Sequence, residues 1–151
     1  MEIVKTKTDE LDYVKTVELA EQKCLKLPQV ECPIVHRFGP GIYIREMFIP
    51  AGTFVIGHHH NFENTNIMLK GRLTLLNEDG TTTELTAPFF YVGKPGRKMA
   101  YIHEDVVWQN IYATDERDIE KLESQFITKS TEWIANKELL DNIVKLQLEV
   151  R

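Results

Sequence analysis

Residues 42–60, IYIREMFIPAGTFVIGHHH, contain the pattern that decides the fold class. Side chains two apart in a strand share a face, so Tyr43, Arg45 and Met47 lie together and the residues between them lie opposite. PAG at 50–52 then predicts a turn. A period of two that ends at a turn signal is typical of short antiparallel strands.

Similar runs continue to residue 113. They are FVIGHHH (54–60), NIMLKGRLTLLN (66–77), TTTEL (81–85), FFYV (89–92) and VVWQNIYA (106–113), with turns at EDG (78–80) and KPG (94–96). Many short strands at regular turn spacing predict a sandwich or a barrel.

Helical patterns lie at both ends of the chain. Residues 8–27 predict an amphipathic helix, which Thr8 or Asp9 caps and Pro28 ends. The stretch 28–41, PQVECPIVHRFGPG, predicts an extended arm or a turn. In the tail, one helical stripe is formed by Ile119, Leu122 and Phe126, and a second by Leu139, Ile143, Leu146 and Val150. Such stripes indicate packing in the core or in a dimer.

The length of 151 residues predicts one compact domain. Its parts are a helix in 1–27, a barrel with the proline-rich arm in 28–113 and helices in 114–151. A net charge of -5 and a pI near 5.6 argue against general nucleic-acid binding. The sequence shows no signal-peptide pattern and no membrane-spanning run, so we expect a cytoplasmic protein in which Cys24 and Cys32 are reduced.

The segment GHHHNFENTNIMLKG, residues 57–71, holds three of the five histidines. On a strand His58 and His60 point together and His59 points away. With Glu63 as the nearest carboxylate, the pair forms a three-ligand set for one divalent transition metal such as zinc, iron, nickel or manganese. The alternative is a solvent-exposed polar loop.

The arrangement of PAG, a glycine, His-x-His, an acidic residue and a closing glycine over residues 50–71 resembles the first motif of the cupin family. Pro95 and Gly96 resemble the turn of its second motif. The resemblance implies a mainly β, double-stranded β-helix (jelly-roll) barrel. Asn64 stands where the family has glutamate, and Met99 and Ala100 stand where it has a histidine, whereas His103 lies further along.

A second resemblance covers most of residues 28–127 and concerns small cupin-like proteins of tailed bacteriophages. It is carried by His60 and Glu63, and then by Pro95, Gly96, Arg97, Lys98, Tyr101, Glu104, Asp105 and Trp108. It implies a phage-encoded protein in the host cytoplasm and brings no settled activity with it.

Cations supply another candidate site. If the face of Arg45 lines the barrel lumen, its guanidinium forms an anion clamp; if not, it is a surface charge. Arg97 and Lys98 follow the PG turn and either face a ligand or remain solvated. The predicted ligand-binding residues are Tyr43, Arg45, His58, His60, Arg97, Lys98, Tyr101 and Trp108.

Three classes of function follow, and the sequence does not choose between catalysis and binding. The first is a binder of a small anion at the barrel mouth, which in a phage would sequester a nucleotide-like signal. The second is a metal-dependent isomerase, hydrolase or oxygenase with His58, His60 and Glu63 as ligands and His103 as fourth ligand or base. The third is a virion structural or assembly protein whose helices make the contacts. We expect a homodimer or a larger homo-oligomer in each case.

Overall fold

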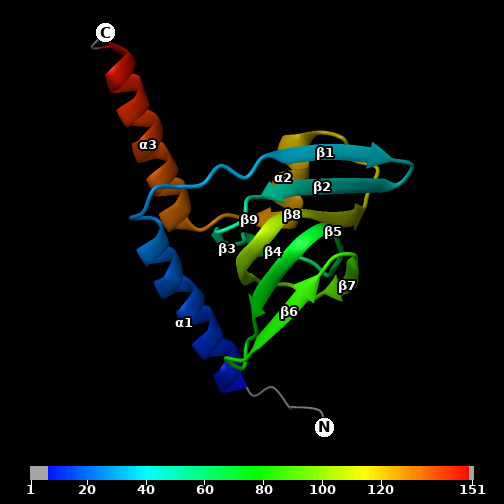
Figure 1. Ribbon diagram of the computed structural model, residues 1–151. Helices are drawn as coiled ribbons and strands as arrows, with labels where there is room; N and C mark the ends of the chain where they lie inside the picture. Colours follow the sequence, from blue (N-terminus) through cyan, green and yellow to red (C-terminus); the bar gives the residue numbers. More distant parts are fainter. Residues whose placement is uncertain (1–6, 150–151) are drawn as a thin grey trace.

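The computed structural model describes the backbone of residues 7–149 and the side chains of residues 12–149 (Figure 1). Helix α1 (Lys7–Cys24) is followed by eight strands, by helix α2 (Ile119–Phe126), by the short strand β9 (Ile127–Thr128) and by helix α3 (Thr131–Glu149). The strands between α1 and α2 are β1 (Ile34–Gly39), β2 (Ile42–Ile49), β3 (Phe54–Ile56), β4 (His59–His60), β5 (Asn64–Leu76), β6 (Thr82–Thr86), β7 (Phe89–Gly93) and β8 (Met99–Ala113).

Two long strands, β5 and β8, each take part in both layers of the barrel. The first half of β5 pairs with β7 and with the second half of β8, which also pairs with β2 and through it with β1. The second half of β5 pairs with β6 and with the first half of β8, which also pairs with β3. All these pairs are antiparallel, so two bent strands join two sheets into a jelly-roll barrel.

A glycine permits the bend in β5. The register between β5 and β8 shifts between Met68 and Leu73, and Gly71 lies inside this irregular stretch with a φ of 100°. A Cβ at Gly71 would collide with the carbonyl oxygen of Asp105 on β8. Because L side chains rarely adopt such a φ, the closing glycine of the sequence motif is needed where one strand passes between the sheets.

Apolar side chains fill two parts of the interior. The first cluster lies between the sheets and contains Ile49, Met68, Leu73, Leu85, Ala100, Ile102 and Val106. The second contains Tyr43, Tyr112, Leu122, Phe126 and Ile127, so α2 packs its buried side chains on the β2 and β8 end of the barrel. Asp118 caps α2 by accepting a hydrogen bond from the backbone N–H of Lys121 at 3.0 Å.

The predicted fold class, a mainly β cupin-type barrel with helices at both ends, is confirmed by this strand arrangement. The predicted element boundaries were wrong in three places. Helix α1 ends at Cys24 rather than at residue 27, part of the expected arm forms strand β1, and the last strand begins at Met99 instead of residue 106. The side chains of Thr8 and Asp9 lie outside the described part. Cys24 and Cys32 are free thiols, and no described helix is long and apolar enough to cross a membrane.

Helix α3 leaves the barrel and projects from it on the side where α1 lies (Figure 1). None of its described residues is buried. The apolar side chains of its predicted stripe, Leu139, Ile143 and Leu146, are 42–60% exposed, and Val150 lies outside the described residues. Core packing is therefore the wrong interpretation for this helix, whereas Leu122 and Phe126 of α2 do enter the core.

Candidate functional site

A cavity of about 100 Å³ opens between the two sheets at the end where the histidines lie. Its apolar wall is formed by Met47, Ile49, Val55, Leu73, Leu75 and Ala100, and its polar wall by Arg45, His58, His60, Asn66, Lys98, Trp108 and Asn110. Among the described residues that line it, none is Asp or Glu. The cavity therefore offers positive charge and hydrogen-bond donors without a protein carboxylate to neutralise them.

Backbone pairing brings the histidine segment beside the PG turn. Gly57 donates its N–H to the carbonyl of Lys98 at 2.9 Å, and His60 and Gly96 exchange two backbone hydrogen bonds of 2.9 and 3.0 Å. These bonds place His58 and His60 at the cavity together with Lys98, whereas His59 is exposed. The alternation predicted for the three histidines thus describes their positions, although only His59 and His60 form a strand.

Arg45 is a buried cation on β2 with an exposed fraction of 5%. Its neighbour across the sheet is Asn110 on β8, which in turn faces Asn66 on β5. No described residue forms a hydrogen bond or an ion pair with the Arg45 side chain, and its Nε is fully enclosed without a partner. Buried charges in proteins are normally paired, so the Arg45 guanidinium is a candidate anion-binding group.

Lys98 supplies a second cation to the cavity. Its Nζ lies 3.5 Å from Oδ1 of Asn66, which is a weak hydrogen bond at best, and 4.7 Å from the ring centre of Tyr91. Burial lowers the pKa of Lys98 to about 8. The ammonium group is therefore still charged at neutral pH, and no carboxylate among the described lining residues of the cavity neutralises its charge.

The two cavity histidines are neutral. Burial, reinforced by the charge of Arg45, lowers the pKa of His58 to about 4, and burial with the charge of Lys98 lowers that of His60 to about 3. The Nδ1 atom of His60 lies 2.5 Å from the hydroxyl of Tyr112, which leaves Nε2 as its second polar atom. His58 packs edge-on against Trp133 of α3 at 4.8 Å between ring centres, and its enclosed Nδ1 has no partner among the described residues.

Three asparagines and a tryptophan form a hydrogen-bonded network beside the cavity. Oδ1 of Asn66 accepts from the indole N–H of Trp108 at 3.0 Å and from the amide of Asn110 at 2.6 Å. Asn64 Oδ1 accepts from Asn66 at 2.9 Å and from Asn110 at 3.0 Å. These three asparagines are all buried, so the network holds the polar wall in one arrangement.

The residues predicted to bind a metal do not come together. His58 and His60 line the cavity, but Glu63 is exposed and His103 lies 2.6 Å from the Thr74 hydroxyl, away from the cavity lining. Within residues 12–149 no group of three or more His, Cys, Asp or Glu side chains is arranged to hold a metal ion. Two imidazoles with two cations beside them do not fit a divalent cation.

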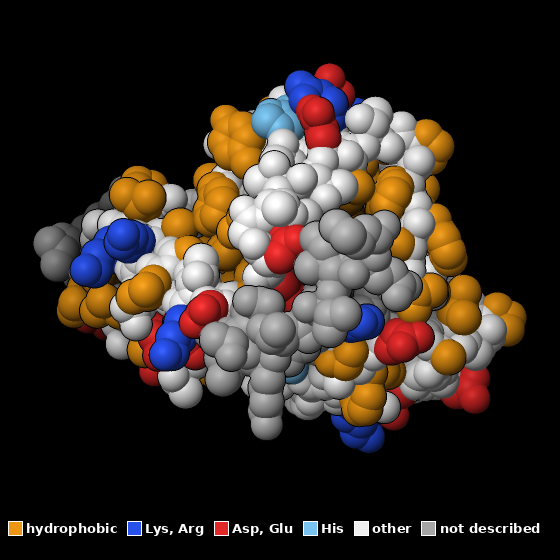
Figure 2. Space-filling view, turned by 90° about the horizontal axis from the view of Figure 1, so that it is seen from below, with side chains coloured by type: hydrophobic (Ala, Val, Ile, Leu, Met, Phe, Trp, Pro, Cys, Tyr) orange, Lys and Arg blue, Asp and Glu red, His pale blue; other side chains and the backbone are white. Residues whose placement is uncertain are grey.

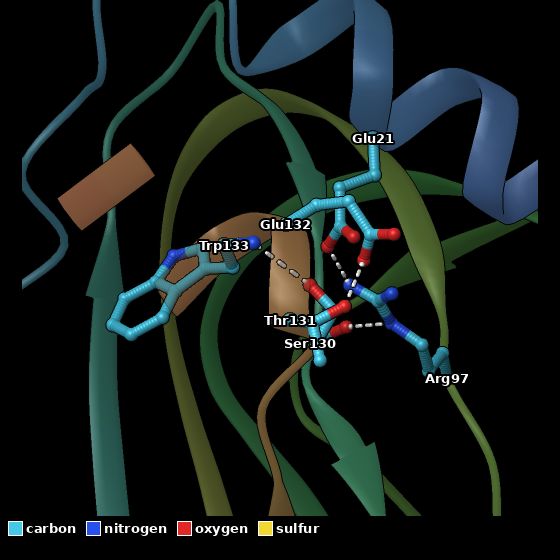
Figure 3. A network of polar contacts seen from close by, with 7 residues as sticks. Glu21, Arg97, Ser130, Thr131, Glu132 and Trp133 are labelled. Atoms are coloured by element: carbon cyan, nitrogen blue, oxygen red, sulfur yellow. Dashed lines mark hydrogen bonds and ion pairs between the residues drawn. The ribbon is translucent and has the colours of Figure 1, made fainter. Parts of the chain in front are cut away.

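Arg97, another predicted ligand residue, instead attaches helix α1 to the barrel. Its guanidinium pairs with Glu21 of α1 and donates from Nε to the carbonyl of Gly57 at 2.7 Å. Figure 3 shows Glu21 and Arg97 facing each other beside Ser130 and Trp133, at the start of α3. Burial would raise the pKa of Glu21, but hydrogen bonds from Arg97 and Ser130 outweigh burial and lower it.

The two remaining predicted residues also lie away from the cavity. Tyr43 is buried in the aromatic cluster, with its hydroxyl 2.7 Å from Nδ1 of His36, and burial raises its pKa to about 12. Tyr101 is 45% exposed on the outside of β8 and contacts the ring of His103. Of the eight predicted ligand residues, the cavity brings together Arg45, His58, His60, Lys98 and Trp108.

A second, larger hollow of about 970 Å³ lies between α1 and the neighbouring end of the barrel. Tyr13 and Val17 of α1 line one side, and Tyr91 of β7 lines the other. Lys98 and Leu75 border both this hollow and the cavity. The cavity thus has a wider space next to it on the side of Lys98.

Two lining residues, Asn66 and Asn110, were not predicted as site residues. A signal for Asn110 exists in the sequence, because it lies two positions after Trp108 and so shares its strand face. Asn66 likewise shares a face with Asn64, the residue that replaces the family glutamate. Their pairing across β5 and β8 depends on register, which period-two patterns do not reveal.

No family model and no curated protein matches the chain. Solved structures similar to it include a double-stranded β-helix protein from Klebsiella pneumoniae, with a TM-score of 0.48 and 15% identity over 64% of this chain and 89% of that one. An RmlC-like cupin family protein from Methanocaldococcus jannaschii has a TM-score of 0.45 and 17% identity over 56% of this chain and 81% of that one. A cupin domain from Bordetella pertussis has a TM-score of 0.44 and 17% identity over 58% of this chain and 98% of that one. At these values the likeness concerns the barrel alone, and the fold assignment rests on the strand pairing described above.

Proposed function

We propose that this protein binds a small anion in the cavity between its two sheets. The observation that carries the proposal is Arg45, a guanidinium that is 5% exposed and has no counter-ion among the described residues. Lys98 adds a second positive charge on the same wall. In a low-dielectric cavity such charges favour an anion strongly, because water does not screen them.

Both the apolar wall and the size of the cavity restrict the ligand. A cavity of ~150 Å³ holds benzene with its six heavy atoms, so about 100 Å³ accommodates roughly four to five heavy atoms, as in a short carboxylate or a tetrahedral oxyanion. A nucleotide-like ligand would place only a phosphate group here. The rest of such a ligand would have to occupy the adjoining hollow, which shares Lys98 and Leu75 with the cavity.

The test is a thermal-shift and calorimetric survey of the full chain with phosphate, sulfate, short carboxylates and mononucleotides. An anion at ~100 times its dissociation constant stabilises the folded state by about 2.7 kcal/mol. Arg45→Met should remove this stabilisation. Arg37→Met is the matched control, since Arg37 is exposed, is paired with Glu46 and does not line the cavity.

If no anion shifts the transition, or if Arg45→Met responds like the native protein, the proposal is wrong. Mass spectrometry of small molecules released from freshly purified protein adds a second, independent measurement. Elemental analysis in the same preparation tests the metal-dependent alternative, which predicts about one transition metal ion per chain. A purely structural role in a virion predicts neither a ligand nor a metal.

A further inference from the structure

Resting on the proposed anion site, we infer that the cavity selects anions that carry a hydrogen-bond donor of their own. The side-chain oxygen of Asn110 is a neutral acceptor on the same wall as Arg45 and Lys98. An anion made only of acceptors, such as sulfate, would meet it unfavourably.

The orientation of the Asn110 amide follows from its neighbours. The indole N–H of Trp108 can only donate, so the atom of Asn66 that lies 3.0 Å from it must be the oxygen. That same Asn66 oxygen lies 2.6 Å from Asn110, which must therefore present its NH₂ group there. Asn110 Nδ2 is also 3.0 Å from Oδ1 of Asn64.

Both hydrogens of the Asn110 amide are thus used inside the protein, and its Oδ1 is left over. No described residue donates to this oxygen. It is also not one of the enclosed, unpartnered side-chain atoms, which within residues 12–149 are Arg45 Nε, His58 Nδ1 and Tyr91 Oη. Since Asn110 lines the cavity and is only 7% exposed, its oxygen meets the cavity space.

The ligand class combines both requirements. One or two anionic oxygens face Arg45 and Lys98, and a hydroxyl or a similar donor within the same group of about five heavy atoms reaches Asn110. Short 2-hydroxy carboxylates and protonated phosphate have this chemistry. Simple carboxylates and sulfate lack the donor.

Two matched ligand pairs test the inference on the native protein, so no variant has to fold. Glycolate and propionate have the same charge and the same number of heavy atoms, but only glycolate has a hydroxyl. Hydrogen phosphate and sulfate are both tetrahedral dianions with five heavy atoms, but only hydrogen phosphate carries a hydroxyl. Calorimetry should show at least one donor-bearing member binding ~10-fold or more tightly than its partner, as a buried acceptor left unpaired requires.

The outcomes separate this inference from the proposed function. Equal binding within both pairs would retain the anion site and overturn the donor requirement. Tighter binding of the acceptor-only members, or binding of none of the four, would also overturn the donor requirement, whereas the anion site itself is overturned only if the wider survey, mononucleotides included, shows no binding either. As a second readout, Asn110→Leu should remove the preference for the donor-bearing member while anions still bind through Arg45.

An independent observation on α3 supports a second inference, and we propose that α3 forms a parallel two-stranded coiled coil with α3 of a second copy. In a heptad register, the a positions are Asn136, Ile143 and, in sequence, Val150, and the d positions are Leu139 and Leu146. β-branched residues at a with Leu at d favour two parallel strands, and a single Asn at a fixes their register.

The surface available on α3 is of the required order. Its exposed apolar residues are Ile134, Leu139, Leu140, Ile143, Val144, Leu146 and Leu148, each 42–64% exposed. Of these, Leu139, Ile143 and Leu146 lie in the seam and Leu140 lies beside it at an e position. Burying such side chains fully removes roughly 60–120 Å² each from water, so these four offer roughly 240–480 Å². That is about a third to three fifths of the ~800 Å² per partner of a stable interface.

Leu146 and Leu148 provide a matched pair for the test, because they are 60% and 64% exposed on the same helix but only Leu146 lies in the seam. Analytical ultracentrifugation of the full chain should show a dimer. Leu146→Gln should weaken the dimer at least ~10-fold and Leu148→Gln less than ~3-fold, with helicity followed by circular dichroism. A native protein that stays monomeric, or equal weakening by both changes, would overturn the coiled coil.

Discussion

The barrel lumen and helix α3 reverse the usual distribution of side chains in opposite ways. The lumen buries Arg45, Asn66 and Asn110, whereas α3 carries exposed Leu, Ile and Val and has no described residue buried. Figure 2, a view from below, shows hydrophobic side chains at the surface on the side of the molecule where α1 and α3 project. A soluble domain normally places such residues the other way round, and the two proposals account for this: an anion would compensate the charge of the lumen, and a second copy of α3 would cover the apolar side chains of the helix.

Replacing Arg45 should have the largest effect, because it removes the buried guanidinium that has no partner among the described residues. Removing an uncompensated buried charge should stabilise the ligand-free protein by about 1–4 kcal/mol, while anion binding is lost. For a domain of this size the melting temperature of Arg45→Met should rise by ~2–4 °C per kcal/mol. If calorimetry without anion shows a lower melting temperature for Arg45→Met than for the native protein, the unpaired charge of Arg45 does not destabilise the ligand-free protein and this prediction is wrong.

The contact between Glu21 and Arg97 connects the two regions, because it ties α1 and the first turn of α3 to the barrel (Figure 3). Glu21→Gln should cost about 1–3 kcal/mol in unfolding free energy, since it leaves a largely buried guanidinium without its carboxylate. The control is Glu84→Gln, which removes an exposed partner of Arg72 and should cost less than ~0.5 kcal/mol. If chemical denaturation shows equal losses of unfolding free energy for the two variants, the Glu21–Arg97 pair contributes no more than an exposed ion pair.

The pH dependence of anion binding tests the contribution of Lys98 in the lumen. Above pH 8 the folded protein carries Lys98 largely uncharged, so affinity for glycolate, which does not titrate there, should fall about tenfold per pH unit. The charged form is disfavoured in the folded state, so without ligand the unfolded chain binds more protons between about pH 8 and 10.5, and stability rises with pH in that window.

The groups that face Lys98 do not share this titration. Burial raises the pKa of Tyr91 above its ordinary value, and His60 is already neutral. Lys98→Met should therefore give an affinity that is weaker but flat from pH 7 to 10 in titration calorimetry. A slope that persists in Lys98→Met would assign the proton to another group.

The smallest expected effect comes from Trp108→Phe. The indole N–H fixes the orientation of Asn66, and Asn66 in turn fixes that of Asn110. Without it both amides can rotate, so the preference for glycolate over propionate should shrink by ~3-fold or less while binding itself continues. An unchanged preference would mean that the asparagines hold one another in place without the tryptophan.

Much of the barrel could be predicted from the sequence, because it depends on local patterns. The alternation in IYIREMFI, the turn at PAG and the glycine at position 71 are each dictated by backbone sterics and by the two-residue period. The same period placed His58 and His60 on one side and His59 on the other. The boundaries of α1 and β8 escaped prediction, because propensity changes gradually at the ends of elements.

The surroundings of those residues depend on contacts between segments that lie far apart in the sequence. Whether Arg45 faced the lumen depended on which sheet face is enclosed, and whether Arg97 faced a ligand depended on Glu21, which is 76 positions away in the chain. His103 and Glu63 left the predicted metal set because neither side chain lines the cavity, while strand register brought Asn66 and Asn110 to it. Local sequence predicts the main strands and the shared side of His58 and His60, since these are properties of a few adjacent residues. The charge of the site comes from Arg45 on β2 and from Lys98 just before β8, and only folding brings these two cations to one cavity.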